Sequence, residues 1–250
     1  MTILMVLAFC AGLNLNGIKM LDRHHRDGDR KEWIPIHYTA CPCKWGDATS
    51  VAGFLLRKRN AGAHYVVDDS LIIQTALEEW SVPAVGGRNW KGFVAKNDLD
   101  KKVTNANSVN YEMCLGWERD NERIIDVTAA AAAYQMVNKG LDIGSVVRHH
   151  DVRGKYCPFF GSVLLTEEQW LKYYRDPIGS GFWNQTYEDR QFYRFKLLVQ
   201  YYHKQQLIRK DQKKGKITPE LADKLIKSLV RPFAVFYEGK TPPVIATPVR

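Results

Sequence analysis

Cysteine is scarce in this sequence, and its spacing is irregular. The five cysteines are Cys10, Cys41, Cys43, Cys114 and Cys157. An odd number without a repeated spacing does not match a disulfide framework, which argues against the small disulfide-bonded secreted domains. No CxxC pair repeats, so a closed zinc finger or zinc ribbon is not expected either. Reduced thiols fit a chain that folds in a cytosol.

Long hydrophobic runs are also missing. The amino terminus, MTILMVLAFCAGLNLNG, is apolar but too short to span a bilayer. A secretory signal usually has lysine or arginine before its apolar core, and this segment has neither there. We therefore expect residues 1–30 to form an N-terminal extension with a buried strand or helix. The alternative is that residues 1–17 act as a signal and the protein is secreted.

Acidic residues are few in the last part of the chain. Residues 178–250 contain 14 lysines and arginines against 6 aspartates and glutamates, a net +8 of the +9 carried by the whole chain. Such a segment favours a polyanion: nucleic acid, anionic lipid or the anionic polymers of a bacterial wall. It lacks zinc-finger, leucine-zipper and RNA-binding signatures, so nucleic acid is not expected. The alternative is a solvated helical face that only keeps the protein soluble.

Up to residue 177, short β-favouring runs alternate with helical patterns. The hydrophobic fraction of 45% is enough for a core. The alternation predicts an α/β domain over residues 31–177. Strands are expected at 33–38, 63–69, 71–74, 108–115 and 143–148, helices at 48–60, 121–138 and 166–175, and a long surface loop at 81–107.

A linker is predicted where Asp176-Pro177 is followed by Gly-Ser-Gly at 179–181. Beyond it, Phe192, Phe195, Leu198, Val199 and Tyr202 repeat at helical spacing, and a second helix is expected to begin at Thr218-Pro219. These patterns predict that 178–250 is a small basic helical unit, either an anchor to wall polymers or a surface for self-association. Deleting it is expected to leave a folded domain.

Three side chains could form an open zinc site. His37 and His149 each lie at the end of a predicted strand, and Cys157 comes eight residues after His149 in RHHDVRGKYCP. Two imidazoles and one thiolate leave the fourth tetrahedral position for water, which is typical of catalytic zinc. Taken one at a time, each residue has an ordinary structural explanation. Their combination is what indicates a metal.

Two further residues suit hydrolysis at such a site. Glu112, on a predicted strand, could take a proton from water and return it to a leaving nitrogen. Lys155 could stabilise negative charge on a carbonyl oxygen. Either one could also be an ordinary surface or ion-pair residue.

From about Glu32 to Arg175 the chain resembles the zinc-dependent N-acetylmuramoyl-L-alanine amidases of the phage-lysozyme and peptidoglycan-recognition-protein superfamily, and most of all the endolysins of Gram-positive phages and prophages. Four segments carry the resemblance, in the family's order and at its spacing: IHYTA (36–40), AHYVVDDSLIIQ (63–74), NSVNYE (107–112) and RHHDVRGKYCP (148–158). The last is the most specific.

The resemblance implies that His37, His149 and Cys157 bind one Zn²⁺, and that Glu112 and Lys155 are the catalytic residues. It also implies that His64, Asn110 and His150 line the substrate groove. The sequence departs from the family pattern at two places. Ala63 holds a position where some members have tyrosine, and PAVGG (83–87) lacks the usual Trp-His, so a substrate-contacting histidine is missing.

The implied fold is a central mixed β-sheet flanked by helices, with zinc in a groove along one side. The implied function is lysis of bacterial peptidoglycan at the amide between N-acetylmuramic acid and L-alanine. A phage endolysin would stay in the host cytoplasm until its release to the cell wall. The alternative function is a recognition module that binds peptidoglycan without cutting it, but such proteins typically lack the cysteine that is present here at position 157.

Overall fold

The computed structural model describes residues 29–39, 47–58, 60–86, 93–116, 119–175 and 181–232. The predictions made for Cys10, Cys41, Cys43, for most of the N-terminal extension and for the linker up to residue 180 lie outside the described residues. Within them, Cys114 and Cys157 are free thiols. No helix in these ranges is long and apolar enough to cross a membrane.

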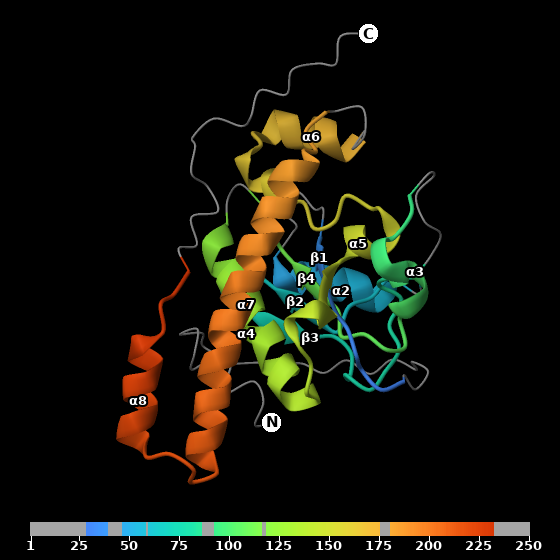
Figure 1. Cartoon of the computed structure of the whole chain (residues 1–250). Helices are drawn as coiled ribbons and strands as arrows, with labels where there is room; N and C mark the ends of the chain where they lie inside the picture. Colours follow the sequence, from blue (N-terminus) through green and yellow to red (C-terminus); the bar gives the residue numbers. More distant parts are fainter. Residues whose placement is uncertain are drawn as a thin grey trace.

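A five-stranded mixed sheet forms the centre of the molecule (Figure 1). The strands lie in the order β3-β2-β4-β1-β5, and all neighbouring pairs are parallel except the antiparallel hairpin of β2 and β3. Their bounds are β1 Ile34–Tyr38, β2 Tyr65–Val67, β3 Ile72–Gln74, β4 Tyr111–Met113 and β5 Val146–Arg148. The expected mixed sheet flanked by helices is confirmed.

The two faces of the sheet are covered by different helices. Tyr65 and Val67 of β2 belong to the main core with α4 (Asn121–Lys139), whereas Val66 between them packs with Val51 of α2 (Ala48–Arg57). Successive side chains of a strand point to opposite faces, so the sheet is buried on both sides. This explains why the strands are short continuous apolar runs.

Helix α4 is the most deeply buried helix partner of the sheet. Asp120 caps its first turn by accepting the backbone N–H of Arg123, and Gly140 ends it with φ 67°. Glycine adopts this left-handed conformation without the steric cost of a Cβ. All five alanines at 129–133 are buried, because α4 lies between the sheet and another helix. Small side chains allow both neighbours to approach closely.

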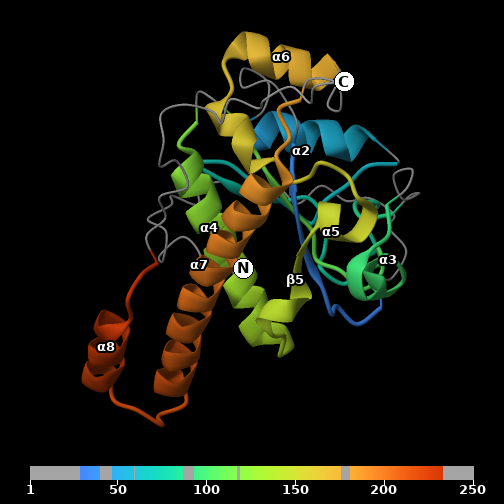
Figure 2. The same cartoon turned by 45° about the horizontal axis from the view of Figure 1, so that its top comes forward.

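The neighbour on the outer side of α4 is α7 (Gln185–Lys213), which runs alongside it in both views (Figures 1 and 2). Phe195, Leu198 and Val199 of α7 are 0–1% exposed and belong to the same core cluster as β1 and α4. The helices expected in the C-terminal part of the chain are present, and α7 packs into the same core as the sheet. A chain ending at residue 177 would leave the outer face of α4 open to water.

Helix α8 (Pro219–Ser228) folds back against α7, with Thr218 as its N-cap and proline at its first position, as predicted. Within the predicted loop 81–107 the structure contains two short helical turns, so that segment is only partly irregular. The remaining elements are η1 Lys96–Asp98, α3 Leu99–Lys102, η2 Ile143–Ser145, α5 His149–Arg153, η3 Phe160–Leu164 and α6 Glu167–Arg175.

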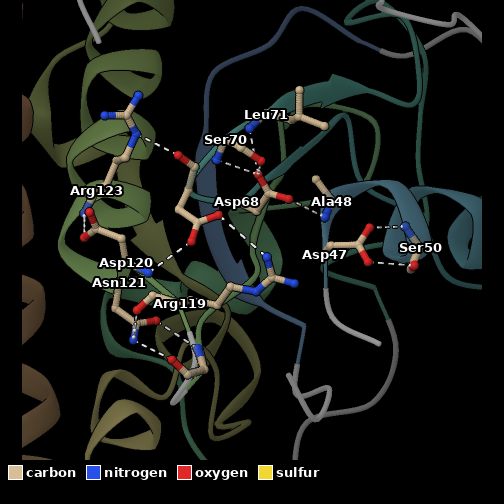
Figure 3. Close-up of polar contacts among 12 residues, drawn as sticks. Asp47, Ala48, Ser50, Asp68, Ser70, Leu71, Arg119, Asp120, Asn121 and Arg123 are labelled. Atoms are coloured by element: carbon tan, nitrogen blue, oxygen red, sulfur yellow. Dashed lines mark hydrogen bonds and ion pairs between the residues drawn. The ribbon is translucent and has the colours of Figure 1, made fainter. Parts of the chain in front are cut away.

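The turn between β2 and β3 holds the starts of α2 and α4 (Figure 3). The buried carboxylate of Asp68 accepts the backbone N–H groups of Ser70, Leu71 and Ala48, the last being the first residue of α2. The backbone carbonyl of Asp69 accepts from the Arg123 side chain of α4 at 2.7 Å. One tight turn thereby fixes the helices on both faces relative to the same pair of strands.

Truncation of Phe195 tests whether α7 belongs to the core. Phe195 is 0% exposed, so Phe195→Ala is expected to lower the free energy of unfolding by about 3–5 kcal/mol. Leu207→Ala on the same helix is the control, because Leu207 is 43% exposed and the change should stay within about 0.5 kcal/mol. Urea unfolding followed by circular dichroism measures both. If Phe195→Ala lowers the free energy of unfolding as little as Leu207→Ala does, α7 does not belong to the core.

Candidate metal centre

The register of three parallel strands brings the candidate site residues together. On β1 and β4, His37 lies directly opposite Glu112. On β1 and β5, Ile36 lies opposite Arg148, so His149 follows immediately beside His37. The ends of three neighbouring strands thus carry Glu112, His37 and His149 in a row. Residues far apart in the chain become neighbours at one edge of the sheet.

Cys157 is returned to this row by the turn after α5. Gly154 ends that helix with φ 73°, and the backbone N–H of His150 donates to the carbonyl oxygen of Cys157 at 2.7 Å. The loop is therefore closed by a hydrogen bond between the residue after His149 and Cys157 itself. This brings the thiol back to the imidazole that begins the loop.

Three candidate ligand atoms converge at this place. Nδ1 of His37 lies 3.0 Å from Nδ1 of His149 and 3.7 Å from Sγ of Cys157, and all three atoms lie within 4.8 Å of one another. Two imidazoles and one thiol form a donor set that suits Zn²⁺ with an open fourth position. The residues present therefore fit the ion that the sequence suggested.

Asn110 determines which nitrogen of His37 faces the site. The Nε2–H of His37 donates to Oδ1 of Asn110 at 3.1 Å, which leaves the lone pair on Nδ1 directed toward His149 and Cys157. Hydrogen bonds of this kind orient metal-binding histidines and fix their tautomer. Asn110 is 0% exposed. It supports His37 from within the fold and is not open to a substrate groove, where we had expected it.

Burial keeps both imidazoles neutral, as metal ligands must be. Burial lowers the pKa of His37 to about 4, against the opposing effect of the Asn110 hydrogen bond. Burial, with His37 and Lys155 nearby, lowers the pKa of His149 still further. Burial also raises the pKa of the Cys157 thiol, and Glu112 adds to that shift. A bound cation would reverse this last effect, because a coordinating thiol is deprotonated.

Glu112 has the features of a proton carrier. The side chain is half-buried, and its Oε2 is buried without a hydrogen-bond partner among the described residues. Burial raises the pKa of Glu112 to about 8, while the Lys155 charge opposes the shift. A carboxyl group with a pKa close to neutral can both accept and release a proton in one reaction cycle.

Lys155 acts electrostatically on the whole site. Its charge contributes to the pKa shifts of His37, Glu112, His149 and Cys157. The side chain is half-buried and lies two residues before Cys157 in the same loop. A cation held there would favour negative charge that develops next to the candidate ligands.

Of the other two residues expected in the groove, His64 is fully buried and His150 is half-buried. His64 is 0% exposed: it accepts the backbone N–H of Asn110 and donates to the carbonyl oxygen of Trp80 at 3.0 Å. It is a core histidine that ties neighbouring segments, not a groove residue. His150 is half-buried, donates from Nδ1 to the Lys155 carbonyl oxygen, and packs its ring 5.3 Å from that of Trp183.

The sequence matches the family model described as N-acetylmuramoyl-L-alanine amidase over residues 27–159. This chain belongs to that family. The matched range contains all five candidate ligand and catalytic residues, from His37 to Cys157. It ends one residue before η3, so α7 of the amidase lies outside it.

The fold is similar to that of solved amidases and endolysins to different degrees. The hydrolase AmiA of Staphylococcus aureus, solved with its ligand, has a TM-score of 0.50 and 17% identity over 88% of this chain and 95% of that one. The PlyG catalytic domain has a TM-score of 0.47 and 19% identity, covering 63% and 92%. A mutant endolysin from Bacillus subtilis has a TM-score of 0.45 and 21% identity, covering 58% and 85%. No curated protein matches the chain.

Removal of the Asn110 side-chain amide tests whether its hydrogen bond positions His37 for metal binding. Asn110→Ala is expected to weaken zinc binding about 10–100-fold, because an unsupported imidazole loses its tautomer and orientation. Competition with a chromophoric chelator measures the dissociation constant. Asn138→Ala, at an exposed position on α4, is the control. Wild-type zinc affinity of Asn110→Ala would mean that the hydrogen bond does not position His37.

Proposed function

We propose that the amidase is a zinc-dependent peptidoglycan hydrolase that cleaves the amide between N-acetylmuramic acid and the L-alanine of the stem peptide. The observation that carries this proposal is the convergence of His37 Nδ1, His149 Nδ1 and Cys157 Sγ within 4.8 Å. The pairing of β1 with β4 also places Glu112 opposite His37. Family membership supports the amide bond as the target.

His37, His149 and Cys157 would hold one Zn²⁺. When bound, the ion lowers the pKa of water and polarises the scissile carbonyl group. Glu112 takes the proton from the attacking water and passes it to the amide nitrogen of L-alanine as the C–N bond breaks. Lys155 stabilises the negative charge that develops on the carbonyl oxygen. The carboxylate of muramic acid and the free amino group of the peptide are the products.

The site of action that we infer is the bacterial cell wall. Two proteins of similar fold have been solved in complex, the amidase AmiD with a muropeptide substrate and the hydrolase AmiA with its ligand. An endolysin would reach the wall from the host cytoplasm at lysis. A recognition module that binds without cutting has less support, because Cys157 and Glu112 are both in place at the site.

Digestion of purified peptidoglycan tests the reaction. The wild-type protein is expected to release stem peptides beginning at L-alanine and to leave glycan strands intact, as mass spectrometry of the products would record. A chelator should stop release and added zinc should restore it. Binding without release would establish the recognition module instead, and products cut elsewhere would refute the proposed bond.

In the same assay Glu112→Gln is expected to lower kcat about 10²–10⁴-fold, because the amide cannot carry the proton. Its zinc content should remain that of the wild type. Glu122→Gln, at an exposed position on α4, is the matched control. If Glu112→Gln cuts walls at the wild-type rate, Glu112 has no part in the mechanism.

We also propose that the turn joining α7 and α8 binds anionic wall polymers. Lys213, Lys214 and Lys216 are exposed there, and Lys224 and Lys227 are exposed on α8. The turn lies at the opposite end of α7 from α5, the helix that begins with His149 (Figure 1). Clustered lysines attract polyanions through a field that salt screens.

Wall sedimentation at increasing salt tests this binding. Changing Lys213, Lys214 and Lys216 to glutamate is expected to weaken wall binding at low salt and to flatten its salt dependence. The control makes the same charge change at Lys96, Lys101 and Lys102, which are exposed near α3. Equal losses in the two triple variants would exclude a specific role for the α7–α8 turn.

A further inference from the structure

Helix α7 lies outside the matched range of the family, yet its first turns contact the chain on both sides of the candidate metal ligands. Two successive acidic residues, Glu188 and Asp189, make these contacts. The proposed mechanism uses neither of them. Asp189 contacts the chain beside His149, and Glu188 contacts the chain that follows Cys157.

Asp189 holds the residue that precedes His149. Its Oδ1 lies 2.8 Å from Nη2 of Arg148, whose side chain is only 7% exposed. The same guanidinium pairs with Asp151 at 2.6 Å, and the carboxylate of Asp151 accepts the backbone N–H of Arg148. The guanidinium also lies 5.0 Å from the ring centroid of Phe192 on α7. Arg148 is thus fixed between α5 and α7, directly beside the His149 ligand position.

Glu188 holds the segment that follows Cys157. Its side chain is 0% exposed, and its two carboxylate oxygens accept the backbone N–H groups of Phe160 and Gly161 at 2.8 and 2.9 Å. Burying a carboxylate is costly unless hydrogen bonds compensate it, so this geometry is strongly specified. A Cβ on Gly161 would lie 2.7 Å from the Phe159 ring and 3.0 Å from Glu188 Oε1. Only glycine permits the approach without displacement.

Aromatic packing extends the same support to His37. The ring of Phe159 packs edge-on against Tyr38, the residue after His37, at a centroid distance of 6.3 Å. Trp183, just before α7, packs 5.6 Å from Phe159 and 4.7 Å from Tyr156. A residue adjacent to each of the three ligand positions is therefore in contact with α7 or with residues tied to it.

We propose that Glu188 and Asp189 of α7 are positioning residues of the metal centre, acting through the loop around Cys157 and through Arg148. This inference rests on the proposed zinc function. The ligand atoms are held by two strand ends and a loop, and metal affinity depends on their spacing to within a few tenths of an ångström. Helix α7 supplies a rigid support behind two of these three positions, in addition to closing the core.

The test compares Glu188→Gln and Asp189→Asn with Asp211→Asn in the full-length protein. In Glu188→Gln one of the two carboxylate oxygens becomes an NH₂ group, which cannot accept a hydrogen bond from the backbone N–H that faces it. In Asp189→Asn the side chain would lose the charge that holds Arg148. Asp211 pairs with Lys216 at the other end of the same helix, so its variant is a matched control. Zinc dissociation constants and the visible spectrum of the cobalt(II)-loaded protein are the two readouts.

Both variants are expected to bind zinc about tenfold or more weakly and to shift the cobalt(II) bands, with Asp211→Asn unchanged on both measures. Melting temperatures of the metal-free proteins separate this effect from a loss of fold. If Glu188→Gln fails to fold, Asp189→Asn decides, because Asp189 is half exposed and the substitution is isosteric.

Wild-type zinc affinity and an unchanged cobalt spectrum in Asp189→Asn, with only stability altered in Glu188→Gln, would overturn the inference and leave α7 a purely structural helix. The wild-type measurement reports separately on the proposed function. A wild-type protein that binds no zinc would refute the zinc proposal itself, whatever the variants do.

Discussion

The parallel pairing of β4, β1 and β5 is the constraint on which the rest of the structure depends. It places Glu112 opposite His37 and brings His149 to the neighbouring strand end. Side chains alternate between faces along a strand, so a slip of one residue in β1 would turn His37 toward α4 and bring Ile36 or Tyr38 to the site. The chemistry of the amidase and the burial of its core are therefore set by the same hydrogen bonds. A change in the register of β1 would therefore disrupt the site and the core together.

Burial gives these residues their chemical properties. The same low-dielectric surroundings keep His37 and His149 neutral, raise the pKa of Cys157 and bring the pKa of Glu112 to about 8. Neutral imidazoles and a thiol that ionises on binding a cation are what zinc coordination needs, and a carboxyl group near neutrality is what proton transfer needs. The Asn110 hydrogen bond adds direction to this environment by fixing the His37 tautomer.

Helix α7 combines structural and functional roles. Its middle turns, with Phe195 and Leu198, close the core over the alanines of α4, and its first turn binds the chain beside His149 and Cys157. Its far end carries exposed lysines. A segment beyond the range that defines the family thus completes the fold, supports the candidate metal centre and presents basic charge, each at a different level along one continuous helix.

Local patterns in the sequence were sufficient to predict the strands, the longer helices and the residue types at the site. The apolar run ending in His37, the alternation around Glu112 and the RHHDVRGKYCP segment all depend on residues close together in the chain. The start of α8 at Thr218-Pro219 was predicted for the same reason. The position of α7 against α4 was not predicted. The spacing of Phe192, Phe195 and Leu198 shows that a helix has an apolar face, but it does not say what covers that face.

The same limit applies to Asn110 and His64, which were expected in a groove and lie buried in hydrogen bonds to His37 and Trp80. Whether a polar side chain on a strand faces water or another buried polar group depends on which strand pairs beside it. By itself, then, the sequence determined the strands, the longer helices and the residue types of the candidate metal centre. Strand register and helix packing were decided only in the tertiary structure, because both arise from contacts between residues far apart in the chain.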